Sequence, residues 1–233
     1  MKLTPIVPPG SPKELASPDE LRALISGWSW PTRGWVLSLV ATPGGKFVGS
    51  DGGSKSIGTK ADRACLLGNR YAADLVVTSA ITARREAYRR SRLTPLLLIS
   101  RSGRFDGIPA IFIAADAADQ QPVYVASRRK PRFPAQSEIV WLRWSLVGIY
   151  GLSKQISKLG FNRVLAETGP TLSRRLINIG AISELRLNVV QLPAGELDPI
   201  KVADAALTEL GVKTRRLVSA DLVDDTLVTR WAL

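Results

Sequence analysis

The chain has 233 residues, of which 45% are hydrophobic and 22% are charged, and this is the composition of a folded protein with one large domain or two small ones. It contains no His and one Cys, which excludes an internal disulfide, a metal site rich in Cys or His, a zinc deaminase and a Ser-His hydrolase. The net charge of +12 indicates an anionic partner. The basic residues are scattered and carry no RNA-binding motif with interleaved aromatics, so a pocket for phosphorylated small molecules explains the charge at least as well as nucleic acid does.

The first segment predicts no export signal and little regular structure. It has no apolar core of a signal peptide, and no window approaches the roughly 18 uninterrupted apolar residues of a membrane span, so a cytoplasmic location follows by default. Residues 1–16 are rich in proline and predict an irregular arm. Ser17, Pro18 and Glu20 then carry the signals of a helix start, and this short helix ends before Gly27.

The next part of the chain predicts alternating strands and helices. Trp28, Trp30 and Trp35 are expected to form a hydrophobic lid or a subunit contact, with a ligand stack as the alternative. Residues 35–41 read as a buried strand, and the Gly-rich loop 49–58 is expected to border a pocket. Thr59 is expected to cap a helix over 61–72 that turns Cys65, Leu66 and Tyr71 inward. The further predictions are a strand over 73–79, a helix over 81–90, strands over 95–100, 110–114, 123–127 and 138–142, and a helix over 146–159.

A polar turn at residues 167–171 stands between a strand over 164–166 and a helix that ends at Gly180. Gly169 lets the backbone approach a ligand closely, and a helix that starts after a strand offers N–H groups to an anion. The turn is therefore a candidate phosphate cradle, and the alternative is an ordinary strand-to-helix turn in which Gly169 and Pro170 serve only geometry.

The C-terminal part predicts a change of architecture. A strand starts near Glu184, residues 189–199 read as a loop, and no helix is predicted after them. Residues 214–219 and 225–231 alternate as strands do and predict an antiparallel hairpin. The chain is thus predicted to be an α/β protein with a doubly wound, mostly parallel sheet and antiparallel C-terminal strands.

Several segments resemble one family when they are taken in order: WVLSLVATPGGK, SDGGSKSIGTKADR, NRYAADLVV, TARREAY, LLLISRSG, LAETGPTL and IGAISELRL. Together they resemble the bacterial RibD C-terminal domain family, the pyrimidine reductase of riboflavin biosynthesis, without the deaminase domain that often accompanies it. The resemblance implies a dihydrofolate reductase-like domain over residues 34–233, preceded by an N-terminal arm with a short helix over 1–33. It also implies NADPH as the cofactor, reduction of a phosphoribosylamino-pyrimidine, and a homodimer that pairs through its C-terminal strands.

The resemblance also implies three cofactor-binding segments. The first would face the NADPH pyrophosphate, the second would hold the 2′-phosphate with a guanidinium, and the third is the turn before the helix. The residues implied are Thr78, Ser79 and Thr82 in the first segment, Ser100, Arg101 and Ser102 in the second, and Thr168, Gly169, Pro170, Thr171 and Leu172 in the third.

Substrate-binding residues are implied by the same match, whereas no catalytic residue and no metal ligand is assigned. They are Ser54, Asp62, Arg63 and Arg70, with Arg84, Glu86 and Glu167 as further candidates. Four of these residues also have a structural interpretation: Asp62 complements a helix start, and Arg63, Arg70 and Arg84 are solvated charges on helix faces.

Three loops depart from the family pattern. Pro43, Gly44, Gly45 and Lys46 stand where the family has Ser-Leu-Asp-Gly, TSAIT replaces Gly-Ala-Gly-Thr, and Glu167-Thr168-Gly169 replaces Glu-Gly-Gly. Because all three loops border the implied pocket, the departures suggest two alternative functions in addition to that of the standard reductase. One is a reductase with a shifted heterocyclic substrate, and the other is a catalytically silent homologue that binds a nucleotide.

Overall fold

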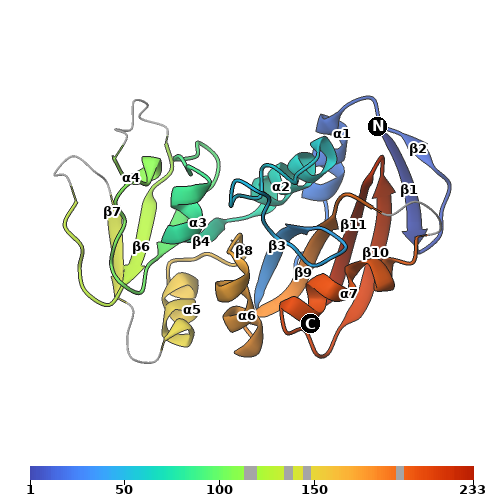
Figure 1. The fold of residues 1–233 in the computed structure, drawn as a ribbon. Coiled ribbons are helices and arrows are strands. Elements are labelled where there is room, and N and C mark those ends of the chain that lie inside the picture. The colour runs from blue at the N-terminus through green and yellow to red at the C-terminus, as the bar shows by residue number, and fades with distance from the viewer. Residues whose placement is uncertain (113–119, 134–138, 144–147, 193–196) are drawn as a thin grey trace. The chain divides into compact units, whose positions relative to one another are not determined.

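The computed structural model describes residues 1–112, 120–133, 139–143, 148–192 and 197–233, and it divides into two compact units (Figure 1). Unit 1 consists of Met1–Ala72 and Pro170–Leu233, and unit 2 consists of Ala73–Gly169. Both units combine helices with strands, which confirms the α/β class. No helix within the described ranges is long and apolar enough to cross a membrane.

Unit 2 is built on parallel strands. They lie in the order β8 (Val164–Ala166), β4 (Leu75–Ser79), β5 (Leu96–Ile99), β6 (Val123–Ser127) and β7 (Ile139–Arg143). The strand β5 is apolar and buried at all four positions, as expected for a parallel strand covered on both faces. The helices of this unit are α3 (Ala80–Arg85), α4 (Pro109–Phe112) and α5 (Ile149–Lys158).

Unit 1 is mixed. The strand β3 (Trp35–Ala41) pairs in parallel with β9 (Ile182–Val189), and the strands beyond β9 pair antiparallel in the order β11 (Thr226–Ala232), β10 (Arg216–Val223), β1 (Lys2–Val7) and β2 (Lys13–Glu14). The predicted antiparallel hairpin at the C-terminus is confirmed, although β10 continues to Val223 through residues expected to connect its strands. The helices are α1 (Pro18–Ser26), α2 (Lys60–Ala72), α6 (Pro170–Asn178) and α7 (Pro199–Glu209).

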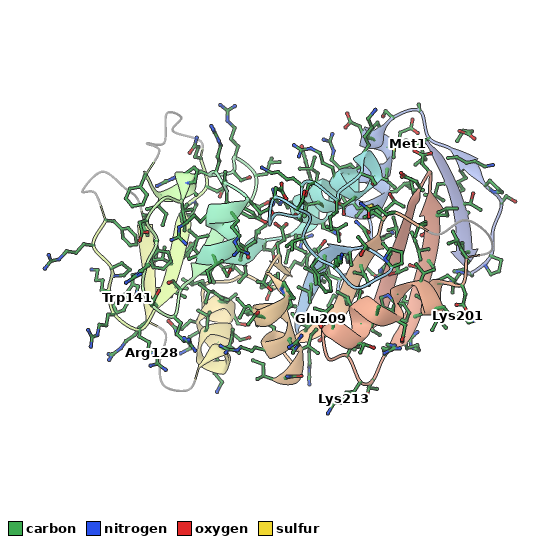
Figure 2. The ribbon with its side chains drawn as sticks, in the orientation of Figure 1. Met1, Arg128, Trp141, Lys201, Glu209 and Lys213 are labelled. Carbon is green, nitrogen blue, oxygen red and sulfur yellow. The ribbon has the colours of Figure 1, made fainter. Side chains whose placement is uncertain are left out.

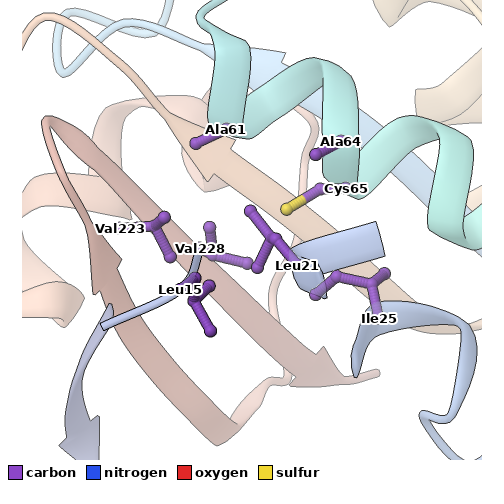
Figure 3. Packing of buried hydrophobic residues seen from close by; sticks show 8 residues of the cluster. All are labelled: Leu15, Leu21, Ile25, Ala61, Ala64, Cys65, Val223 and Val228. Atoms are coloured by element: carbon purple, nitrogen blue, oxygen red, sulfur yellow. The ribbon is translucent and has the colours of Figure 1, made fainter. Parts of the chain in front are cut away.

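The helices α1 and α2 pack closely over the antiparallel strands of unit 1. Leu21 and Ile25 of α1 meet Cys65 of α2 in an apolar cluster that continues to Val223 and Val228 (Figure 3). A Cβ at Gly68 would lie 2.7 Å from the carbonyl oxygen of Arg22 and 2.8 Å from Cβ of Ile25, so the close approach of the two helices requires a glycine there. Burial raises the pKa of the Cys65 thiol, which keeps it protonated and unreactive.

The prediction of an irregular arm over residues 1–16 is wrong. β1 pairs with β10 in the register Leu3 to Val223, and the backbone N–H of Lys2 donates to the Asp224 carboxylate at 2.8 Å. Prolines suggested an arm because they cannot donate to a ladder, but Pro5 is tolerated where the register shifts before Val7. Cross-strand pairing therefore overrides the local signal.

The prediction that no helix follows β9 is also wrong, because α7 spans Pro199–Glu209. The Asp198 side chain caps it by accepting from the N–H groups of Ile200 and Lys201, and Pro199 occupies the first turn. Val202, Ala203, Ala206 and Leu207 are buried at helical spacing. These signals were present in the sequence, but the preceding stretch is rich in Pro and Gly and suggested that the loop continued. Residues 193–196 of the predicted loop lie outside the described residues.

Smaller differences concern element types and ends. Residues 109–112 form α4 where a strand over 110–114 was expected, because Pro109 suits the first helical turn; residues 113 and 114 lie outside the described ranges. The helix expected to reach Arg90 ends at Arg85, since Ala87 adopts a left-handed backbone with φ of 51°. Tyr71 points outward, 55% exposed, below the guanidinium of Arg22. Residues 138, 146 and 147 of the predicted elements also lie outside the described ranges.

Candidate functional site

The carboxyl ends of three neighbouring parallel strands place most of the predicted cofactor residues at one edge of unit 2. In the sheet register, Val77 of β4 lies opposite Ala166 of β8, and Ser79 lies opposite Ile99 of β5. The residues that leave these strands therefore emerge side by side, and this edge is where open α/β sheets bind ligands. Ser79, Ser100 and Glu167 mark the three strand ends.

A hydroxyl pair joins two of these strand ends. Ser79 caps α3 by accepting from the N–H of Thr82 at 3.0 Å, and the two side-chain oxygens lie 2.9 Å apart. The Oγ1 atom of Thr82 also accepts from the N–H of Gly169 at 3.2 Å. The structure thus brings together Ser79, Thr82 and Gly169, three of the residues predicted to face the cofactor.

The hydrogen-bond accounting of this pair leaves one donor for a ligand. Each hydroxyl carries one proton and two acceptor lone pairs. Each oxygen accepts one backbone N–H, and only one of the two protons can lie between Ser79 and Thr82. The other hydroxyl proton remains able to donate to a group at this edge, such as a phosphate oxygen.

Thr78 links two neighbouring strand ends of the sheet in this structure. It is fully buried, and its hydroxyl donates to the carbonyl oxygen of Glu167 at 2.5 Å. A contact between Thr78 and a cofactor would require this hydrogen bond to be given up, so that role stays a prediction. Thr168 is 1% exposed and is packed into the interior.

Glu167 is a buried carboxylate with an aromatic partner. Its side chain is 5% exposed, and Oε2 accepts from the Tyr88 hydroxyl at 2.5 Å. Tyr88 is directed there by the left-handed turn at Ala87, after which the Tyr88 N–H donates to the carbonyl of Ala83 at 2.8 Å. For a non-glycine residue this backbone conformation costs about 1–2 kcal/mol.

The segment TARREAY, which contains Tyr88, carries part of the family resemblance, but no role is predicted for Tyr88 from the sequence. No local pattern marks it, because its partner lies 79 positions further along the chain. The predicted position of Glu167 at the strand end is found, and its orientation towards a substrate stays a prediction.

The segment after β5 provides the exposed cation predicted for the 2′-phosphate. Ser100 is 5% exposed, and its Oγ lies 3.3 Å from Oγ of Ser102. Arg101 is exposed, and its side chain makes no hydrogen bond or ion pair with any residue that the structure describes. A guanidinium in this position can bind an anion with two parallel hydrogen bonds.

Two of the substrate candidates of unit 2 lie in α3 or at its end. The Nε of Arg84 donates to the carbonyl oxygen of Asp106 at 2.7 Å, and its Nη2 lies 3.8 Å from the Asp106 carboxylate. Arg84 is therefore tied to a neighbouring loop, a contact that the structural interpretation as a solvated charge on a helix face did not expect. Glu86 occupies the C-cap of α3 and is partly exposed.

The remaining predicted residues lie in unit 1. Asp62 accepts from Nδ2 of Asn188 at 2.8 Å, which the sequence did not predict because the two residues are 126 positions apart. Arg63 is exposed on α2, whereas Ser54 and Arg70 are half-buried and have partners. The predicted third cofactor segment crosses the unit boundary: Thr168 and Gly169 end unit 2, while Pro170, Thr171 and Leu172 form the first turn of α6 in unit 1.

The loop that departs most from the family pattern is a tight turn. The Gly45 N–H donates to the Thr42 carbonyl at 2.9 Å, and the Thr42 N–H donates to the Lys46 carbonyl at 2.9 Å. Gly45 has φ of 75°, and a Cβ there would lie 3.0 Å from the carbonyl oxygen of Ala205 in α7. A carboxylate at position 45 is therefore opposed by both the backbone and the packing.

The tryptophans before β3 enclose a buried charge cluster. The Arg186 guanidinium lies 5.3 Å from the Trp28 ring and 5.0 Å from the Trp30 ring, and it donates to Glu184 at 2.7 Å. Glu184 also accepts from Arg230 at 2.9 Å. Burial lowers the pKa of Arg186 and the Glu184 charge opposes this, so the guanidinium stays protonated. Trp28 and Trp30 thus cover arginine, a third outcome beside the lid and the ligand stack.

Exposed basic side chains also occur outside these clusters. Those of Lys201 and Lys213 in unit 1 and of Arg128 in unit 2 extend from separate segments (Figure 2). No group of three or more acidic, His or Cys side chains that could hold a metal ion occurs in the described part of the chain.

No family model matches the sequence, and no curated protein matches it either. Solved structures do match the fold. A pyrimidine reductase-like protein of Corynebacterium diphtheriae is 18% identical, with 91% of this chain and 98% of that chain covered and a TM-score of 0.64. The riboflavin biosynthesis reductase of Saccharomyces cerevisiae is 13% identical, with 92% and 96% covered and a TM-score of 0.57.

A third solved structure is a larger protein. It is a Thermotoga maritima diaminohydroxyphosphoribosylaminopyrimidine deaminase and 5-amino-6-(5-phosphoribosylamino)uracil reductase, 17% identical, with a TM-score of 0.62. The match covers 86% of this chain and 56% of that one, so this chain spans just over half of it. At such identities the similarity concerns the fold: this chain folds as the RibD-like pyrimidine reductases do, which confirms the predicted fold.

Proposed function

We propose that the chain is an NADPH-dependent reductase that acts on a phosphoribosyl-pyrimidine or a related heterocycle, similar to the 5-amino-6-(5-phosphoribosylamino)uracil reductases. The observation that carries the proposal is the strand edge of unit 2, where Ser79, Thr82 and Arg101 follow two adjacent parallel strands. The fold shared with pyrimidine reductases supports it. The cofactor would supply the hydride when bound.

The residues at this edge fit a phosphorylated dinucleotide. One hydroxyl proton of the Ser79 and Thr82 pair can donate to a pyrophosphate oxygen. The exposed Arg101 guanidinium would bind the 2′-phosphate that distinguishes NADPH from NADH, because its planar fork matches two phosphate oxygens. The chain itself would thus bind and orient the cofactor, and the buried Glu167 would be fixed beside it by Tyr88.

Cofactor binding tests the proposal directly. Purified protein is titrated with NADPH and with NADH by calorimetry, and saturable binding with a preference for NADPH is expected. Arg101→Ala should weaken NADPH binding roughly ten-fold or more and leave NADH binding nearly unchanged, as a lost charged hydrogen bond predicts. Arg104→Ala is the matched control, since Arg104 is an exposed arginine of the same loop. Failure to bind either dinucleotide would reject the reductase, and an equal loss for both would reject the role of Arg101.

The substrate assignments complete the proposal. Ser54, Asp62, Arg63, Arg70, Arg84, Glu86 and Glu167 remain predictions as substrate contacts, as do the cytoplasmic location and the homodimer. Light scattering of the purified chain would test the homodimer. Turnover of the phosphoribosylamino-pyrimidine, measured as NADPH oxidation, would test the substrate.

A second candidate is a homologue that binds a nucleotide without reducing a substrate. The turn at Gly45 favours it, because the carboxylate expected from the family pattern is absent and would not fit there without movement of α7. This candidate predicts saturable NADPH binding together with no NADPH oxidation when the pyrimidine substrate is added. Measurable turnover by the native sequence would exclude it.

A further inference from the structure

A cavity lies in unit 1, between α1 and the antiparallel strands. Its volume is about 270 Å³. The strand side is formed by Leu3 and Pro5 of β1 with Asp221 and Val223 of β10, which stand opposite one another in the register of the two strands. None of the residues that line the cavity belongs to the predicted cofactor or substrate sites.

The helix side of the cavity is apolar. Leu21 and Ile25 of α1 are buried, and they join the same wall as Trp28 just beyond the end of the helix. Leu24 also lines the cavity but is 46% exposed, so it stands at the opening. An apolar wall with an opening of this kind favours a ligand with a hydrocarbon or aromatic body, because burial of apolar surface is the main favourable contribution.

One carboxylate interrupts the apolar lining. Asp221 is partly buried, and its side chain makes no hydrogen bond or ion pair with the residues that the structure describes. Burial raises the pKa of the Asp221 carboxyl, and the charge of Lys13 lowers it in part. A carboxylate removed from water without a partner carries a desolvation cost, and a cation placed beside it would recover that cost.

Lys13 of β2 also lines the cavity, and its charge acts on Asp221 from a distance. Its side chain is exposed and forms no ion pair with Asp221 within the described ranges. An external cation can therefore pair with the Asp221 carboxylate directly.

We propose that this cavity binds a small organic cation, a protonated amine attached to an apolar group, with the ammonium donating to Asp221 and the apolar group packed against α1. The volume is just below the roughly 300–1,000 Å³ of pockets for drug-sized ligands, so the ligand is small. The proposal does not depend on the reductase function, since the two sets of residues do not overlap.

Binding of simple amines tests this inference. Hexylammonium and the neutral analogue 1-hexanol are titrated into the full chain, with binding followed by calorimetry and by chemical shifts in NMR spectra. Hexylammonium should bind saturably, and at least ten-fold more tightly than 1-hexanol, because only the ammonium can pair with the carboxylate.

Three variants separate the contributions of charge and cavity. Asp221→Asn should weaken hexylammonium at least ten-fold, whereas Asp225→Asn, which removes the same charge from an exposed position of the same hairpin, should change it less than two-fold. Leu24→Trp should block the opening and abolish binding of both probes. The thermal unfolding of each variant shows that it is folded.

Three results would overturn the proposal. The first is the absence of saturable hexylammonium binding by the native chain. The second is equal binding of hexylammonium and 1-hexanol. The third is binding by Asp221→Asn as tight as by the native chain, which would assign the amine to another part of this basic protein. Since no dinucleotide is used in these titrations, their failure leaves the reductase proposal unaffected, and failure of NADPH binding leaves this one unaffected.

Discussion

The two units pair polar side chains by different chemistry. In unit 1, Glu184 and Arg186 form an ion pair on β9 that is closed by Arg230 of the neighbouring strand and covered by indole rings. In unit 2, Ser79 and Thr82 form a neutral hydroxyl pair at a strand edge. The charged cluster has its hydrogen bonds satisfied internally, whereas the hydroxyl pair keeps one proton for a donor bond. Clusters of the first kind hold a fold together, and those of the second kind can also bind a ligand.

The largest expected effect concerns the charge cluster of unit 1. Glu184→Gln removes the carboxylate that Arg186 and Arg230 share and leaves the buried guanidinium of Arg186 without its counter-charge. We expect the free energy of unfolding to fall by about 3–5 kcal/mol, measured by urea denaturation followed by circular dichroism. Glu209→Gln, which breaks the half-exposed pair with Arg174, should cost less than about 1 kcal/mol. Equal losses would mean that the buried cluster is not structural.

A smaller effect is expected for the buried carboxylate of unit 2. Tyr88→Phe removes the hydroxyl that donates to Glu167 and should lower the free energy of unfolding by about 1–3 kcal/mol. Tyr124→Phe is the control, because the Tyr124 ring packs edge-on against Phe161 and its hydroxyl has no hydrogen-bond partner in the described part of the chain. A loss no greater than in the control would contradict the pairing with Glu167.

The hydroxyl pair itself should contribute less to stability than to binding. Ser79→Ala removes the cap of α3 and should cost about 1 kcal/mol of unfolding free energy, while Ser79→Thr retains the cap. If the pair also serves the cofactor, Ser79→Ala weakens NADPH binding and Ser79→Thr restores it. A variant that loses stability while binding NADPH normally would restrict Ser79 to a structural role.

The smallest effect concerns the ion pair of Asp74 and Arg163, which is partly exposed. Burial alone would raise the pKa of Asp74, but hydrogen bonds from the Arg163 N–H, the Arg163 guanidinium and the Asn162 N–H hold it below its usual value. The contribution of the Asp74 carboxylate to the free energy of unfolding is therefore fully present above the unfolded pKa of about 3.9. It is lost as the pH falls through the folded pKa. Asp74→Asn should cost less than about 1 kcal/mol at pH 7. A loss that does not shrink as the pH is lowered from 7 into the acid range would contradict this origin.

Local signals in the sequence predicted the elements that depend on local physics. The apolar run Trp35–Ala41 is β3, and Thr59 caps α2 by accepting from the N–H of Asp62. β1 could not be predicted in the same way, since Pro5 argues against a strand and the β10 residues that pair with β1 lie at the other end of the chain. The helix α7 had a readable cap at Asp198, and the preceding loop residues obscured it.

The residues of the candidate site also fall into those that the local sequence predicts and those that depend on partners far along the chain. The strand-end positions of Ser79, Ser100 and Glu167 follow from the order of strands and turns, because parallel strands end at a common edge. Tyr88 and Asn188 could not be identified, because each acts through a partner that only the fold brings near. Exposure also has to be read from the structure: Arg101 is available to a ligand, while Arg84 is tied to Asp106.

The turn at Gly45 has a consequence for how this sequence can change. A Cβ at this position would lie 3.0 and 3.1 Å from the carbonyl oxygen and carbon of Ala205, which are backbone atoms of α7. No side-chain substitution at position 205 removes those atoms, so a residue larger than glycine at position 45 requires the turn or the helix to shift by a few tenths of an ångström. The turn and α7 are thus coupled, and the effect of a substitution at position 45 depends on how far the helix backbone yields.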